Sequence, residues 1–186
     1  DLSLPESLLK TLSARLDADA EARPAFPGDS GERQPVHTVY GGAQIFRSDS
    51  AARLGETELK TLEAFAPDAA TLATALGRPA DDPIVARLYP RVVEKLRREP
   101  VEDFRIDFED GFGVRPDAEE DRTALEAADE VYAGMVNGTL PPFIGIRIKQ
   151  LSPELRGRAF RTLDLFLSRL VKRSGGRIPD RFHVTL

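Results

Sequence analysis

The chain has 186 residues, with 26 basic and 31 acidic side chains, a net charge of −5 and 41% hydrophobic residues. That length and hydrophobic content suffice for one domain with a sizeable core. The acidic balance offers no broad basic field for nucleic acid or an anionic membrane. The absence of cysteine excludes disulfides, iron–sulfur clusters and thiol catalysis, and no apolar run reaches the roughly 20 residues of a membrane span. We therefore expect a cytoplasmic protein that binds neither nucleic acid nor membranes.

The hydrophobic pattern predicts a series of helices and strands. Leucines at helical spacing over residues 4–15 predict a leading helix, and the Pro- and Gly-rich residues 21–34 predict a flexible connection. Strands are expected over 35–40, which Gly41-Gly42 should stop, and over 103–110, 143–149 and 182–186. Helices are expected over 49–65, 68–76, 82–98, 117–136 and 152–172.

Residues near the helix ends and interiors predict local details. Asp117 and Glu120 stand at the spacing of a capping box, and Ser152 before a proline predicts a capped helix start. Pro90 lies inside the helix over 82–98 and should kink or break it. Asn137-Gly138 should end the preceding helix.

Strands that alternate with helices imply a parallel sheet with right-handed connections. A buried parallel strand is normally apolar on both faces, but two of these strands are apolar on one face and ionic on the other. The apolar positions are Phe104, Ile106, Phe108, Ile144, Ile146 and Ile148, and the opposite positions include Arg105, Asp107, Glu109, Arg147 and Lys149.

Two arrangements explain this pattern. An antiparallel sheet could turn its charged face to water. Alternatively, crossover helices cover the apolar face and the charged faces meet inside a barrel, near the mouth where catalytic residues of such barrels lie. The second arrangement gathers Asp107, Glu109, Asp110, Arg147 and Lys149 at one mouth.

The residue types at this mouth suggest a chemistry. Carboxylates suit a hard divalent cation such as Mg²⁺, and the planar fork of Arg147 matches a carboxylate or an enolate oxygen. A structural ion-pair network is the alternative. His37, on the first strand, could also point into the mouth, although a structural role is the simpler interpretation. We treat Arg147, Lys149, Asp107 and His37 as candidate substrate-binding residues.

The segment Ile106-Asp107-Phe108-Glu109-Asp110-Gly111, followed by Gly145-Ile146-Arg147-Ile148-Lys149, resembles the HpcH/HpaI aldolase and citrate lyase beta-subunit superfamily. The stretches 35–40 and 99–105 look like an uncharacterised bacterial, aldolase-like branch of it. The resemblance covers roughly residues 35–186. It implies a TIM barrel that binds phosphoenolpyruvate or pyruvate, and a carbon–carbon lyase or aldolase acting on a pyruvate- or oxaloacetate-like keto acid through an enolate.

The resemblance also implies roles for individual residues. Arg147 would bind the carboxylate and the enolate oxygen, while Glu109 and Asp110 would lie near the substrate and the water shell of Mg²⁺ or Mn²⁺. These three are therefore the candidate catalytic residues. The principal metal ligands would lie beyond Leu186, and no general base is identified. Lys149 stands where the family has Asn, so the charge of the pocket and its substrate can differ from those of citrate lyase.

A (β/α)₈ barrel needs about 250 residues. We therefore expect residues 1–34 to form a leading helix and linker, and residues 35–186 to form the N-terminal half of a barrel, truncated in the fourth strand. Homo-oligomers are usual among the relatives and are expected here. The alternatives are a malate-synthase-like enzyme that condenses an acyl-CoA, and a catalytically silent barrel that acts as a binding or assembly subunit.

Overall fold

The computed structural model describes residues 5–22 and 31–186 and has a mixed α/β fold. Its four strands pair in parallel in the order β1-β2-β3-β4, which confirms the predicted parallel sheet and rules out the antiparallel alternative. The strands are β1 (Thr38–Gly42), β2 (Asp103–Asp107), β3 (Phe143–Arg147) and β4 (Phe182–Thr185). None of the helices in these described ranges is long and apolar enough to cross a membrane.

The helices occur close to the predicted positions. They are α1 (Glu6–Ala22), α2 (Ser50–Phe65), α3 (Ala69–Ala75), α4 (Pro83–Arg98), α5 (Asp117–Asn137) and α6 (Arg156–Ser174), with a short 3₁₀ helix η1 (Ala43–Ile45). The leading helix is longer than expected, and most of the predicted connection, residues 23–30, lies outside the described residues.

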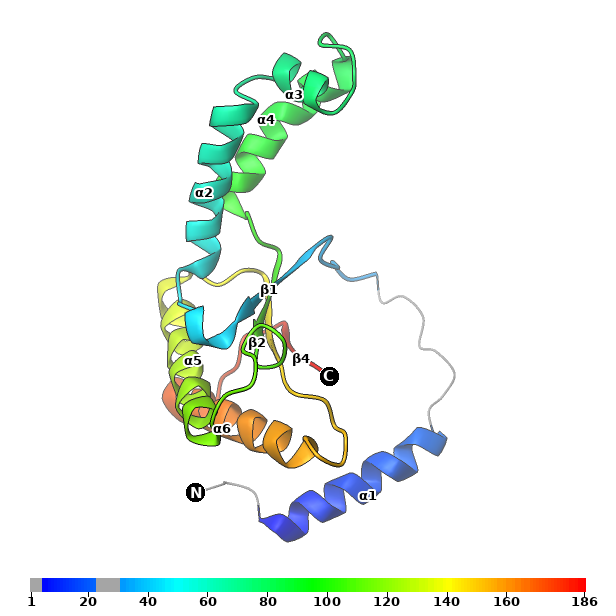
Figure 1. Ribbon diagram of the computed structural model, residues 1–186, viewed down its shortest axis with the longest axis vertical. Coiled ribbons are helices and arrows are strands. Elements are labelled where there is room, and N and C mark those ends of the chain that lie inside the picture. Colours follow the sequence, from blue (N-terminus) through cyan, green and yellow to red (C-terminus); the bar gives the residue numbers. More distant parts are fainter. Residues whose placement is uncertain (1–4, 23–30) are drawn as a thin grey trace.

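Three helices, α2, α3 and α4, connect β1 to β2 and form an arm that extends from one end of the sheet (Figure 1). Aspartates begin two of them, because the Asp68 carboxylate accepts a hydrogen bond from Thr71 N at 2.7 Å and that of Asp82 accepts one from Ile84 N at 2.7 Å. Pro90 does not break α4, which continues as one helix through it.

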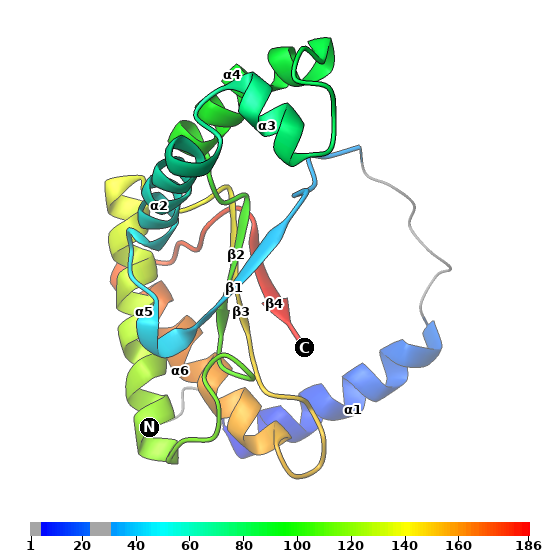
Figure 2. The ribbon, with the colours of Figure 1, turned by 45° about the horizontal axis from the view of Figure 1, so that its top comes forward.

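The hydrophobic core lies between one face of the sheet and helices α5 and α6, which both cover that face (Figure 2). The apolar positions of the two central strands are all buried there, against residues that include Val131 of α5 and Phe166 and Leu170 of α6. Burial of this face fixes the register of each strand, since a shift by one residue would exchange its two faces. Arg105, Asp107 and Arg147 are thereby directed to the opposite face.

The glycine pair does not end β1, although the sequence predicted that it would. Gly41 and Gly42 are both within the strand. A Cβ atom at Gly41 would lie 2.6 Å from Cζ of Phe104, and one at Gly42 would lie 2.3 Å from the carbonyl oxygen of Gly111. The two glycines therefore leave room for a core ring and for the turn that follows β2.

Two predicted helix caps are wrong. Pro116, with no side-chain hydrogen bond, precedes α5, and Glu120 is buried and accepts from Lys149 and from Thr162 of α6 instead of closing a capping box. Helix α6 begins at Arg156, because Ser152 starts a separate turn in which its carbonyl oxygen accepts from Arg156 N at 2.9 Å. Gly138 ends α5 in the left-handed conformation, as predicted.

We predict that Gly55→Ala destabilises the protein. A Cβ atom on this buried residue of α2 would lie 2.6 Å from Pro100 Cγ and 2.8 Å from the carbonyl oxygen of Leu96. The α2 backbone would have to move away, so the free energy of unfolding in urea should fall by about 1–3 kcal/mol.

Gly157→Ala is the matched control, because a Cβ atom there meets nothing within 4 Å. This change in the first turn of α6 should leave stability unchanged or raise it by about 0.5–1 kcal/mol. Equal effects of the two substitutions would contradict the packing described for α2.

Candidate functional site

An ion pair joins β2 and β3 at their carboxyl-terminal ends. Asp107 and Arg147 are partners in the register of these strands. Arg147 donates from Nε to Oδ1 of Asp107 at 2.9 Å and from Nη2 to Oδ2 at 2.6 Å. The side chain of Asp107 is only 3% exposed. Because both contacts are made in parallel, the pair fixes the plane of the guanidinium as well as its position.

The carboxylate of Asp107 has no acceptor site to spare. Its Oδ1 also accepts from Glu109 N at 2.8 Å, and its Oδ2 accepts from Gly111 N at 2.9 Å. Each oxygen therefore accepts two hydrogen bonds, close to the capacity of an ionised carboxylate. Asp107, predicted to bind substrate, instead holds Arg147 and the turn that follows β2.

Arg147 is held on one edge and available on the other. Glu109 lies beside it, with 3.3 Å from Arg147 Nε to Oε2, and Asp110 accepts from Nη2 at 3.0 Å. The guanidinium carbon lies 4.9 Å from the centre of the Tyr40 ring, a cation–π distance. From Nη1 we find no hydrogen bond to any residue in the described ranges. The structure thus brings Asp107, Glu109, Asp110 and Arg147 together, with the Nη1 edge unused.

The cluster has an excess of negative charge. Three carboxylates surround one guanidinium, which leaves a net charge of −2. Burial raises the pKa of Asp107, but the hydrogen bonds from Arg147 and from the two backbone amides outweigh it and hold that pKa below its usual value. The hydrogen bonds to Asp107 raise the pKa of Arg147 against the opposing effect of burial. Both groups of the pair are therefore ionised at neutral pH.

Lys149 does not join this cluster. Strand β3 ends at Arg147, and beyond it the Lys149 side chain reaches toward the helices, donating to Glu120 Oε2 and to the carbonyl oxygen of Phe108, each at 2.8 Å. Glu120 is 1% exposed and also accepts from Thr162 of α6 at 2.6 Å. Lys149 therefore supports the base of the turn that carries Glu109, on the helix side of the sheet.

His37 also lies away from Arg147. It directly precedes β1, so it is at the amino-terminal end of the sheet, whereas Arg147 is at the carboxyl-terminal end. Its Nε2 accepts from the backbone of Glu102 at 3.4 Å. This contact fits the structural role that the sequence left open.

The carboxylate oxygens around Arg147 suit contact with the water molecules that surround a metal ion. Asp107 is saturated, but Glu109 and Asp110 each retain acceptor positions and lie at the rim, their side chains 21% and 83% exposed. Across the described ranges no three carboxylate or histidine side chains converge as a metal-binding group. The two side chains therefore suit contact with the water shell of a divalent cation better than a complete ligand set.

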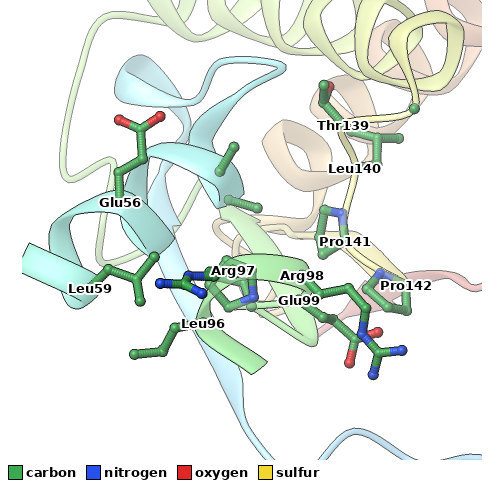
Figure 3. Close-up of a pocket in the computed structure, with 15 residues that line it drawn as sticks. Glu56, Leu59, Leu96, Arg97, Arg98, Glu99, Thr139, Leu140, Pro141 and Pro142 are labelled. Carbon is green, nitrogen blue, oxygen red and sulfur yellow. The ribbon is translucent and has the colours of Figure 1, made fainter. Parts of the chain in front are cut away.

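A pocket of about 580 Å³ lies elsewhere, at the amino-terminal end of the sheet (Figure 3). It opens between the arm and the loop before β3, where Leu59, Leu96 and Pro141 line it, with Arg97 and Arg98 at its edge. It contains none of the residues of the Arg147 cluster, which sits at the opposite end of the strands.

One contributor to the cluster, Tyr40, and one partner of Lys149, Glu120, were missed from the sequence. Tyr40 was assigned only to the strand pattern, and Glu120 only to a helix cap. The alternation of β1 places Tyr40 and Gly42 on one face, and the parallel register sets Gly42 opposite Asp107, so correct strand bounds would have indicated Tyr40. The sequence carries no comparable signal for Glu120, because its partners are Lys149, after the end of β3, and Thr162 of α6.

Comparison with known proteins finds one matching family, and its function is unknown. The sequence profile of a family described as a domain of unknown function, DUF6986, matches residues 15–186. No protein with curated function and no solved structure matches the chain. The match begins within α1 and includes every residue of the Arg147 cluster.

We predict that Asp107→Asn lowers the free energy of unfolding at pH 7 by about 1.5–3 kcal/mol, since charge-assisted hydrogen bonds to a buried group are lost. An unperturbed Asp titrates near pH 4. Because folding lowers the pKa of Asp107, its contribution is complete above that pH and is lost as pH falls through the lower pKa of the folded state. Urea unfolding from pH 7 to pH 2 should show this acid-dependent loss in the parent protein and a smaller one in Asp107→Asn.

Asp110→Asn is the control, because it removes a carboxylate from the same arginine at an exposed position. Its effect on unfolding should stay below about 1 kcal/mol. Equal losses in the two variants would show that burial of Asp107 does not set the strength of the pair.

Proposed function

The chain belongs to the DUF6986 family, whose function is unknown, and from its own site we propose that it is a metal-dependent carbon–carbon lyase or aldolase acting on a keto acid. The observation that carries this proposal is the Arg147 guanidinium, fixed by Asp107 and left with an unused Nη1 edge at the carboxyl ends of parallel strands. Ligands of open α/β sheets and barrels bind at that end.

The proposed fold is the first half of a (β/α)₈ barrel. Three features support it: the order of strands in the sheet equals their order in the chain, a helix follows each of β1, β2 and β3, and α5 and α6 cover one face. In a closed barrel the charged face would point inward. The Arg147 cluster would then lie at the mouth where barrel enzymes carry their catalytic residues.

Arg147 would bind the carboxylate of the keto acid and donate from Nη1 to the oxygen that becomes negative as the enolate forms. A donor that is already oriented gains most from the charge that develops in the transition state. Asp107 would keep the guanidinium in place, and Tyr40 would pack against it. Arg147 would thus bind and orient the substrate without a covalent bond to it, while Asp107 and Tyr40 hold Arg147 in position.

A divalent cation such as Mg²⁺ suits the charge of the cluster. An anionic keto acid would be repelled by a net charge of −2, and a bound cation would remove this repulsion. Glu109 and Asp110 would accept hydrogen bonds from the water molecules of that cation. The cation itself would supply Lewis-acid polarisation of the keto oxygen.

Replacement of Arg147 is the direct test of this function. In calorimetric titrations with pyruvate and with oxaloacetate in the presence of Mg²⁺, Arg147→Ala should weaken binding by about 10- to 100-fold, since it removes charge-assisted hydrogen bonds. Arg122→Ala removes a guanidinium that is 65% exposed on α5 and should leave binding unchanged. Unchanged affinity in Arg147→Ala would exclude the assignment.

Glu109→Gln tests the role of the carboxylate. Gln preserves the shape of the side chain but removes its charge, so the Mg²⁺ concentration for half-maximal oxaloacetate cleavage should rise by about tenfold. Glu126→Gln, an exposed change on α5, serves as the matched control. An identical Mg²⁺ dependence in the parent and in Glu109→Gln would rule out a metal-associated role for Glu109.

A further inference from the structure

A second guanidinium lies on the same face of the sheet as Arg147. Arg105 is two residues before Asp107 on β2 and is paired with Gly145, two residues before Arg147 on β3. From the spacing of strands and residues, the Cα atoms of Arg105 and Arg147 are about 8 Å apart along this diagonal. Two long side chains at such a separation can contact one small ligand.

Arg105 is also held by a buried aspartate, in this case through one hydrogen bond to a residue of its own strand. Its Nη1 donates to Oδ1 of Asp103 at 2.7 Å, and Asp103 is 1% exposed. The other carboxylate oxygen of Asp103 accepts from the Thr38 hydroxyl at 2.9 Å. Thr38, Asp103 and Arg105 thus form a connected unit on β1 and β2 that fixes one end of the guanidinium.

Most of the donors of Arg105 have no protein partner in the described part of the chain. A guanidinium carries five N–H groups, and we find one hydrogen bond from this one, to Asp103. The side chain is 11% exposed, and none of its unpaired nitrogens in the described structure is fully buried, so these donors remain accessible. These donors can form charge-assisted hydrogen bonds with an anionic ligand.

Gly145 leaves the space that Arg105 uses. A Cβ atom at this position would lie 3.0 Å from Nη1 of Arg105 and 2.0 Å from the carbonyl oxygen of His183. The absence of a side chain on β3 therefore lets the guanidinium of Arg105 lie across the sheet. Arg105 and Arg147 are presented on one continuous face.

We propose that Arg105 is a specificity-determining residue, which binds a second carboxylate of the substrate while Arg147 binds the keto-acid end. The inference rests on the proposed function and narrows its substrate class to keto acids with two carboxylates, such as oxaloacetate. A monocarboxylate such as pyruvate can contact Arg147 and leaves Arg105 unused. The Asp103–Arg105 pair is thus part of the site as well as of the sheet.

The test is the calorimetric affinity of the protein for oxaloacetate and for pyruvate, each measured with Mg²⁺. The parent protein should bind oxaloacetate about 10- to 100-fold more tightly than pyruvate, because a second charge-assisted contact is made. Arg105→Gln should remove this preference and leave the affinity for pyruvate within about twofold. Arg105→Lys keeps the positive charge beside Asp103 but loses the planar fork, so it should retain part of the preference for oxaloacetate. This variant distinguishes the loss of that fork from a folding defect.

The possible outcomes separate this inference from the function on which it rests. If the parent binds both acids equally, or if Arg105→Lys and Arg105→Gln weaken both to the same extent in folded protein, Arg105 has only a structural role and the inference is wrong. If pyruvate binding depends on Arg147 in the same experiment, the proposed function still stands. If the parent binds neither acid, both proposals are wrong.

Discussion

The bidentate contact between Asp107 and Arg147 is the interaction on which the site depends. It forms because the parallel register of β2 and β3 sets these two residues directly opposite each other. The same carboxylate also accepts from the backbone amides of Glu109 and Gly111, so Asp107 holds the turn that carries Glu109 and Asp110. One buried carboxylate therefore fixes the guanidinium, the two neighbouring carboxylates and the end of the strand.

The core on the other face of the sheet makes this contact possible. The aliphatic and aromatic side chains of β2 and β3 are buried against α5 and α6, and a shift of either strand by one residue would turn charges into that core. Hydrophobic burial thus sets the register, and the register sets the ion pairs. A second buried aspartate on the same face, Asp103, holds Arg105 of its own strand through one hydrogen bond.

Sequence patterns predicted these features where they depend on strand alternation alone. The parallel sheet, the apolar face and the convergence of Asp107 with Arg147 follow from period-two alternation and from helices between strands. Lys149 and His37 were misplaced for two different reasons: β3 ends at Arg147, so alternation no longer directs Lys149, and His37 precedes the part of β1 that pairs with β2. The stacking of Tyr40 on Arg147 and the burial of Glu120 depend on contacts between distant elements, which a local pattern does not contain.

We propose that a keto acid binds to the free Nη1 edge of Arg147 while Asp107 holds the opposite edge. A crystal structure of the protein with Mg²⁺ and pyruvate tests it directly. We expect a carboxylate or keto oxygen of the ligand within hydrogen-bonding distance of Arg147 Nη1, with the Asp107–Arg147 contact intact. Pyruvate bound at another place, or bound only after that contact has broken, would contradict this binding mode.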